Sequence, residues 1–408
     1  MPTVLTRVIS DLLVALAGGL IAQMIARWTE LPDIVFFVLT GIILGPQGLH
    51  VFQLAPSTTV SDVVFTLGSL AMLYEGGRSI ELAVMAKIWR GTLILATLGV
   101  LVTTAIMAVA IHFLLGQSWL VATLIAAVLA STDPATIIPL FQQVRLQARL
   151  AQLVQAESAF NDATSSALSL LLMAMVLGGP VHLAHAFGQF ARLMVGGLLV
   201  GGISSYALNL LLSQRRYRRL VLDSLEHPVI ISLAIVLISY LMAVWLGASG
   251  FMAAFTAGVV TGNAEALGVG IPGSHGVAHE NYLFTNATVI RMLIFILLGS
   301  QVNFLAVWHL LLPGLAVMVV FLFLSRPATV FLCLPLDFGG RWTLRELAFV
   351  SWVRETGVMP AALAGMFAAL GVPGAATLSS LVFLAVLLTI IVQGASTGWW
   401  ARRLRLSQ

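Results

Sequence analysis

The chain has 408 residues, of which 60% are hydrophobic and only 9% are charged, whereas a soluble domain carries roughly 25% charged residues. This composition excludes a soluble globular protein. The net charge of +4 does not indicate nucleic-acid binding, because the basic residues stand in short loops without interleaved aromatic residues. Apolar runs such as 91–115 reach the roughly 20 residues that a bilayer-spanning helix needs. We therefore predict an all-α polytopic membrane protein.

Thirteen apolar segments predict about thirteen transmembrane helices. In chain order they cover residues 10–28, 33–48, 60–77, 90–115, 119–142, 149–178, 187–212, 228–247, 249–263, 284–303, 310–335, 346–370 and 375–398. Lysine and arginine follow the first, third, fifth, seventh, eleventh and thirteenth segments and are missing after the even-numbered ones. Because basic residues concentrate in cytoplasmic loops, we expect a cell (inner or plasma) membrane protein with its N-terminus outside and its C-terminus in the cytoplasm. We expect no soluble C-terminal domain.

Two of the predicted helices are interrupted by proline and glycine. The interruptions are Ser131–Pro139 in the fifth helix and Arg354–Pro360 in the twelfth. Proline removes a backbone donor and breaks a helix, and free carbonyls at such a break can coordinate a cation where they face a cavity. Plain kinks are the alternative interpretation of either break taken alone.

Matched positions in the two halves of the chain indicate a weak internal repeat. Gly76 and Gly299, and likewise Pro134 and Gly357, are 223 residues apart, while Gly41 and Gly45 precede Gly258 and Gly262 by 217 residues. Seven helices separate the matched elements, and an odd number reverses the direction across the membrane. Inverted repeats with discontinuous helices near the midplane are typical of secondary transporters.

Seven charged residues lie deep inside the apolar segments. The acids are Asp133, Glu157, Asp162 and Glu355, and the bases are Arg291, Arg326 and Arg354. A charge at the bilayer centre costs about 2.5–3.5 kcal/mol on insertion scales and usually marks an ion pathway. Three bases against four acids leave one acid without a fixed partner.

The sixth helix carries an oxygen-rich cluster. Glu157 and Asn161 share one helix face, with Ser158 and Asp162 beside them. Hard oxygen ligands suit an alkali cation, and the lack of nearby cysteine or histidine excludes zinc and copper. A buried carboxyl that holds either a proton or a cation couples the two ions, provided that the site faces each side in turn. A purely structural, paired Asp162 is the alternative.

These motifs resemble a known family of transporters. Glu157-Ser158-Ala159-Phe160-Asn161-Asp162, preceded by Ser131-Thr132-Asp133-Pro134, is similar to the NhaP and sodium/proton exchanger branch of the cation:proton antiporter superfamily. The resemblance covers most of the chain. It implies an NhaA/NhaP-like fold of two inverted repeats with crossed discontinuous helices, in a homodimer.

The resemblance also implies a role for individual residues. It makes Asp162 the carboxylate that binds the cation or the proton. Asn161 is the neutral neighbour that marks electroneutral exchange, and Thr132 (through its backbone) and Ser158 are further ligands of the monovalent cation. Asp133 is the aspartate of the helix break. Glu157 pairs with Arg326, and Arg354 lies near the crossing of the two broken helices.

Two residues depart from the family pattern. Many members have Arg-Gly where this chain has Arg354-Glu355, so that an additional acid stands in the second break. Arg291 stands where animal exchangers carry a glutamate, and a snorkelling or interfacial arginine is its simplest interpretation.

The resemblance implies a single membrane transporter domain over residues 1–408. Within this domain it distinguishes groups of helices with different roles. Residues 1–89 and 228–303 are expected to form dimerisation or scaffold helices. Residues 90–178 and 306–398 are expected to form the ion-transporting core, with 187–212 as a linking helix.

We therefore expect a secondary active transporter that exchanges Na⁺, or alternatively Li⁺ or K⁺, for H⁺ in pH homeostasis, with 1:1 stoichiometry and alternating access. We expect no cofactor, and no residue set points to an enzyme. The expected partners are the transported ions, the lipid bilayer and a second copy of the chain. The alternative is an ion channel or a non-transporting membrane sensor with the same fold.

Overall fold

The computed structural model describes residues 4–29, 33–52, 59–132, 141, 145–179, 183–214, 227–270, 277–300, 302 and 304–407. Within these ranges the regular secondary structure is helical, apart from an isolated bridge between Leu146 and Ser407. Each of the thirteen predicted segments contains at least one described helix, which confirms the all-α prediction. Among the described residues, six helices are long and apolar enough to cross a membrane.

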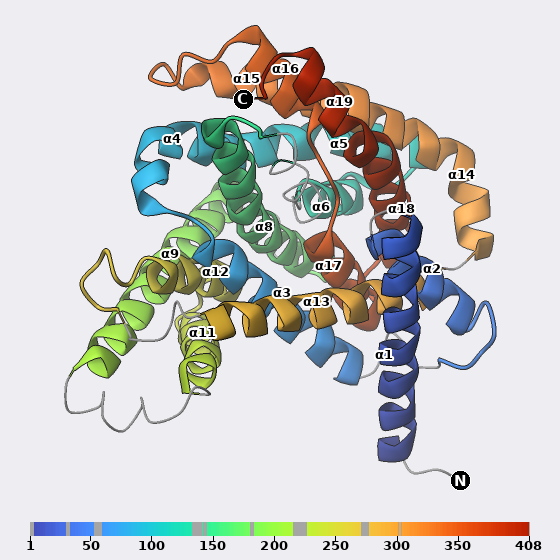
Figure 1. The fold of residues 1–408 in the computed structure, drawn as a ribbon. Coiled ribbons are helices and arrows are strands. Elements are labelled where there is room, and N and C mark those ends of the chain that lie inside the picture. Colours follow the sequence, from blue (N-terminus) through green and yellow to red (C-terminus); the bar gives the residue numbers. More distant parts are fainter. Residues whose placement is uncertain are drawn as a thin grey trace.

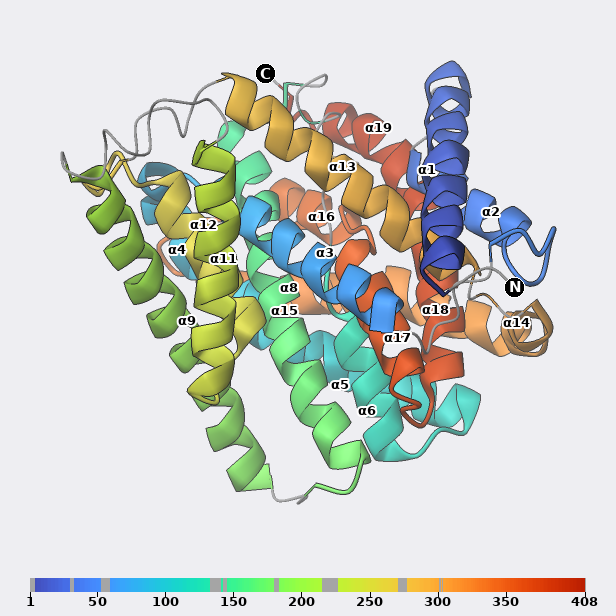
Figure 2. The same cartoon turned by 90° about the horizontal axis from the view of Figure 1, so that it is seen from below.

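The helices pack in two groups (Figures 1 and 2). The first group contains α1 (Val4–Thr29), α2 (Asp33–Leu44), α3 (Thr59–Arg78), α9 (Leu183–Ser213), α11 (His227–Trp245), α12 (Gly250–Gly262) and α13 (Val277–Ser300). These helices occupy the lower half of Figure 1.

The second group contains the remaining helices, most of which lie in the upper half of Figure 1. They are α4 (Leu82–Ile94), η1 (Leu95–Gly99), α5 (Val100–Leu115), α6 (Trp119–Leu129), α8 (Ala148–Val176), α14 (Phe304–Val319), η2 (Val320–Ser325), α15 (Arg326–Cys333), η3 (Leu334–Leu336), α16 (Leu344–Trp352), α17 (Val358–Ala369), α18 (Ala375–Leu388), η4 (Thr389–Gly394) and α19 (Ala395–Arg403). Most contact between the groups is made by α8 and α17, which pack against α3, α12 and α13.

Helix ends differ from the sequence prediction at two places. The fourth helix begins at Leu82 rather than near residue 90. Lys87 and Arg90 therefore lie on its exposed first turns and not in a loop. The second helix ends at Leu44 rather than at residue 48, because Pro46 disfavours helical backbone in the residue before it.

Both predicted interruptions coincide with helix ends. In the fifth helix, α6 ends at Leu129, and Ser131 and Thr132 have non-helical backbone; Asp133 and Pro134 lie outside the described residues. In the twelfth, α16 ends at Trp352 and α17 begins at Val358. The segment between them, Val353–Gly357, is buried.

Glycines bring two helix pairs of the first group into backbone contact. A Cβ added to Gly258 of α12 would lie 2.1 Å from the Tyr74 carbonyl oxygen of α3. A Cβ on Gly41 of α2 would likewise lie 2.1 Å from the Ile296 carbonyl oxygen of α13. The α3–α12 and α2–α13 crossings are therefore equivalent, as an inverted repeat requires.

The same contacts correct one position of the predicted repeat. Gly299 touches the Val38 carbonyl of α2, and its counterpart against the Phe255 carbonyl of α12 is Gly77, at the same Cβ distance of 2.2 Å. The predicted Gly76 instead faces the Ala159 side chain. The spacing in this part of the repeat is thus 222 residues rather than 223, because two adjacent glycines made the alignment ambiguous.

We expect Gly258→Ala to destabilise the protein by about 1–3 kcal/mol, the usual cost of overpacking. The new methyl group would force α3 and α12 apart at a contact made by backbone atoms, which cannot move aside as a flexible side chain would. The matched control is Gly202→Ala on α9, where the nearest atom to an added Cβ is 3.6 Å away. Thermal unfolding in detergent measures both variants, and equal melting temperatures would contradict the predicted role of the crossing.

Candidate ion-binding site

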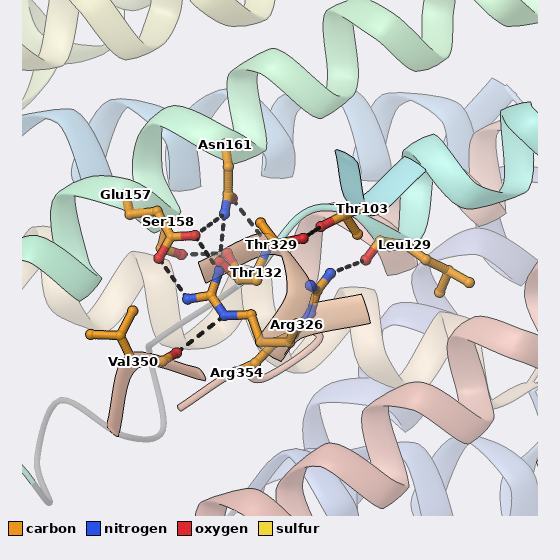
Figure 3. A network of polar contacts seen from close by, with 10 residues as sticks. All are labelled: Thr103, Leu129, Thr132, Glu157, Ser158, Asn161, Arg326, Thr329, Val350 and Arg354. Carbon is orange, nitrogen blue, oxygen red and sulfur yellow. Dashed lines mark hydrogen bonds and ion pairs between the residues drawn. The ribbon is translucent and has the colours of Figure 1, made fainter. Parts of the chain in front are cut away.

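The end of α6 is held by side chains of α8 (Figure 3). The Thr132 N–H donates to Asn161 Oδ1 at 3.1 Å, and Asn161 Nδ2 donates to the Thr132 hydroxyl oxygen at 2.7 Å. The Ser158 hydroxyl donates to the Thr132 carbonyl. The N–H, the carbonyl and the hydroxyl of Thr132 are thus all bound by Ser158 and Asn161, which stand one helical turn apart on α8. These bonds fix the non-helical backbone after Leu129.

Asp162 lies next to the same break. Its carboxylate accepts a hydrogen bond from the Ser131 hydroxyl. Asp162 is partly exposed, whereas Glu157, Ser158 and Asn161 are all buried. Asp162 is therefore the acid of this cluster that is not fully buried.

Glu157 forms a buried ion pair with Arg326. The two terminal nitrogens of the guanidinium donate to the two carboxylate oxygens at 2.6 and 2.8 Å, and Arg326 Nε donates to the Val350 carbonyl at 3.2 Å. Both side chains are about 97% buried. Each carboxylate oxygen thus accepts a hydrogen bond from one guanidinium nitrogen, and Arg326 connects α8 with α15 and α16. Asn161 Nδ2 lies 3.5 Å from Glu157 Oε1.

Arg354 connects the second break to the first. Its Nη2 donates to the Leu129 carbonyl at the C-terminal end of α6 at 2.7 Å, and its guanidinium lies 4.3 Å from the centre of the Phe321 ring. A cation at a helix C-terminus is favoured by the helix dipole. This contact crosses between the two halves of the chain, as Figure 3 shows.

The remaining predicted charges lie elsewhere. Glu355 is buried on the side of the second break that faces η4. Arg291 lies 3.5 Å from Asp33 at the start of α2, so that it connects α13 with α2. Asp133 is outside the described residues.

Ser131 bonds to the Asp162 carboxylate, and it was not among the site residues predicted from the sequence. Its position beside Thr132 in the interrupted segment was the available signal. In the described part of the chain, no group of three or more His, Cys, Asp or Glu residues could hold a metal ion. Hydroxyl, carbonyl and carboxylate oxygens dominate the site, and such oxygens suit a hard monovalent cation.

The chain combines helices long and apolar enough to span a membrane, two helix breaks joined by Arg354, and Asp162 beside the oxygens of the first break. These features define a secondary transporter rather than an enzyme. The chain belongs to the family described as "Sodium/hydrogen exchanger, transmembrane", whose pattern matches residues 12–403. This match confirms the family inferred from the sequence motifs.

The names of individual relatives are consistent with this family. The chain is 27% identical to the K⁺/H⁺ antiporter NhaP of Alkalimonas amylolytica over 95% of this chain and 65% of the relative. It is 27% identical to the Na⁺/H⁺ antiporter 1 of Methanocaldococcus jannaschii over 85% of this chain and 80% of the relative. The chain thus spans less than two thirds of the length of the K⁺/H⁺ relative.

A solved structure has the same fold. The sodium proton antiporter MjNhaP1 from Methanocaldococcus jannaschii at pH 8 superimposes with a TM-score of 0.80 at 24% identity, over 98% of this chain and 99% of that one. The match confirms the predicted antiporter fold.

Proposed function

We propose that this protein exchanges a monovalent cation for a proton across a cell membrane, with both ions competing for Asp162. The observation that carries this proposal is the difference between the two acids of α8. Glu157 is neutralised by Arg326 in a buried pair, whereas Asp162 is partly exposed and bound to a hydroxyl at the helix break. The relatives that are named Na⁺/H⁺ and K⁺/H⁺ antiporters support the same activity.

The ligands of the cation in this proposal are oxygens of the break and of α8. Asp162, Ser158 and the Thr132 backbone supply them, and Asn161 holds Thr132 in place. Protonation of Asp162 removes the charge that attracts the cation, so that the two ions bind alternately. One carboxyl that trades one cation for one proton moves no net charge, so the exchange is electroneutral.

Alternating access requires that the site move relative to a fixed frame. The proposed moving core comprises residues 90–178 and 306–398, the scaffold comprises 1–89 and 228–303, and 187–212 links them. Glycine crossings within the first group support a rigid scaffold. The contacts of α8 and α17 with α3, α12 and α13 then form the sliding surface. We propose a homodimer with an external N-terminus and a cytoplasmic C-terminus.

A proteoliposome assay tests the exchange. Dequenching of an internal pH dye should follow addition of Na⁺, with Li⁺ and K⁺ tested in turn, and the rate should saturate with cation concentration. Sodium is our first choice of substrate. Proton flux that needs no counter-gradient and does not saturate would favour a channel, and no flux with any of the cations would favour a membrane sensor.

The proposed stoichiometry gives a separate expectation. Transport currents on a solid-supported membrane should be small under a cation gradient that drives rapid proton flux. A sustained current that matches one charge per exchanged cation would exclude electroneutral exchange.

A further inference from the structure

Four segments that are far apart in sequence meet at one end of the second group of helices. The turn between α15 and α16 contacts α4, since a Cβ added to Gly339 would lie 3.8 Å from Arg90 Nη1. The same turn contacts the start of α8, where Arg149 donates to one of its backbone carbonyls. The C-terminal segment also lies against the start of α8, because Leu146 forms a bridge with Ser407. The C-terminus is accordingly close to α15 and α16 in Figure 1.

Each of these segments carries an exposed arginine. The set, which we call the basic face, consists of Arg90, Arg145, Arg341, Arg345 and Arg405. It combines side chains from α4, the start of α8, the turn before α16 and the end of the chain. The basic face is therefore formed by the fold and not by one run of sequence.

The acids of the same segments do not offset this charge at the surface. They are Asp337 and Glu346, and both are buried. Asp337 accepts a hydrogen bond from the Trp342 indole at 3.1 Å, and Glu346 accepts one from the Thr343 N–H at 2.7 Å. Glu346 also lies 3.9 Å from Arg149, which is not part of the basic face. The five arginines of the basic face thus present positive charge at the surface.

Three of these arginines stand in backbone that favours glycine. The φ angles of Arg145, Arg341 and Arg405 are 48°, 46° and 57°. A residue with a Cβ adopts such angles at a cost, whereas glycine adopts them freely. His50 is the one other non-glycine residue with positive φ in the described part of the chain. Backbone outliers of this kind are a reason to look for a function of the side chain.

Exposed apolar side chains accompany the arginines. Phe338 is 87% exposed and Leu344 is 74% exposed. Both lie between the end of α15 and the first turn of α16, beside Arg341, and not in the middle of a long apolar helix. Aromatic and aliphatic side chains next to basic ones are typical of protein surfaces at the level of lipid headgroups. This combination favours a membrane surface over a soluble anion.

We propose that the basic face binds the phosphate groups of anionic phospholipids, with Phe338 and Leu344 inserted between the lipids. In the proposed topology these lipids belong to the cytoplasmic leaflet, whose negative charge attracts basic residues next to the membrane. The general excess of basic residues in cytoplasmic loops accounts for the side of the membrane, but not for arginine at three positions that favour glycine. All four segments belong to the proposed transport core, so the lipids would contact the core and not the scaffold.

Native mass spectrometry of the full chain in a non-ionic detergent tests this proposal through the binding of added phosphatidylglycerol. The triple variant Arg145→Gly/Arg341→Gly/Arg405→Gly should bind this lipid about tenfold more weakly or less tightly still, because one arginine near an anionic surface contributes about fivefold. Its melting temperature should not fall, since glycine fits the positive φ angles. Lysine at the same three positions keeps the charge and should retain most of the binding. Arg27→Gln, at an exposed arginine of α1, is the control and should change the affinity little.

Three results would overturn the proposal. Wild type could bind phosphatidylglycerol no more tightly than phosphatidylcholine, or the folded glycine variant could bind it as tightly as wild type. Soluble glycerol phosphate could also compete as well as the lipid does, which would assign the basic face to a soluble anion. If the triple variant does not fold, Arg341→Gly alone decides, with an expected loss of about fivefold; an unchanged affinity would again reject the proposal. The measurement needs no transport, so its outcome is separate from that of the exchange assay.

Discussion

Asp162→Asn should abolish cation-dependent proton flux, with a loss of at least about 100-fold. Asparagine keeps the size of the side chain and can still accept a hydrogen bond from Ser131, but it neither binds and releases a proton nor carries the charge that attracts a cation. Proton flux in proteoliposomes, measured with the same dye and the same cation gradient, gives the rate.

Asp33→Asn is the matched control for this variant. It makes the same chemical change at an acid that lies beside Arg291 at the start of α2, away from the break. Flux through Asp33→Asn should remain near wild type. Residual flux near wild type in correctly folded Asp162→Asn would reject Asp162 as the exchanging group.

Arg326→Met should destabilise the fold by about 3–5 kcal/mol, because it leaves the Glu157 carboxylate buried without its counter-charge. The loss also removes the donor to the Val350 carbonyl, so that α8, α15 and α16 lose their common contact. Thermal unfolding in detergent and the yield of monodisperse protein measure the effect.

The double variant Glu157→Gln/Arg326→Met separates the buried charge from the lost contacts. It should recover a large part of the stability, since no isolated charge stays in the interior. Arg403→Met, at an exposed residue near the end of α19, should change stability little. A single Arg326→Met variant as stable as wild type would show that the pair does not hold these helices together.

Much of the fold could be predicted because the membrane restricts the choices. Apolar segment length predicted every helical region in the described part of the chain, since a chain in lipid must satisfy its backbone hydrogen bonds within helices. Helix ends were less predictable. Lys87 and Arg90 lie on exposed turns in the first part of α4, and hydropathy alone cannot distinguish such turns from a loop.

The candidate site could be predicted only in part. Acids inside apolar segments identified α8 and the second break, and the resemblance proposed Arg326 as the neighbour of Glu157. The contact of Ser131 with Asp162 and the clamp of Asn161 on Thr132 depend on how α6 and α8 approach each other. Residues far apart in sequence meet there, and their hydrogen bonds depend on side-chain directions that one-dimensional spacing does not fix.

The two glycine crossings restrict how this chain can change by mutation. Every single-base substitution in a glycine codon that replaces the residue introduces a side chain with a Cβ atom. At Gly41, Gly77, Gly258 and Gly299 that atom would lie 2.1–2.2 Å from a carbonyl oxygen of the neighbouring helix. No second substitution of a side chain can make room, because the obstacle is backbone. A substitution at any of these four glycines therefore requires a shift of a whole helix. We expect the glycines of each crossing to be retained together.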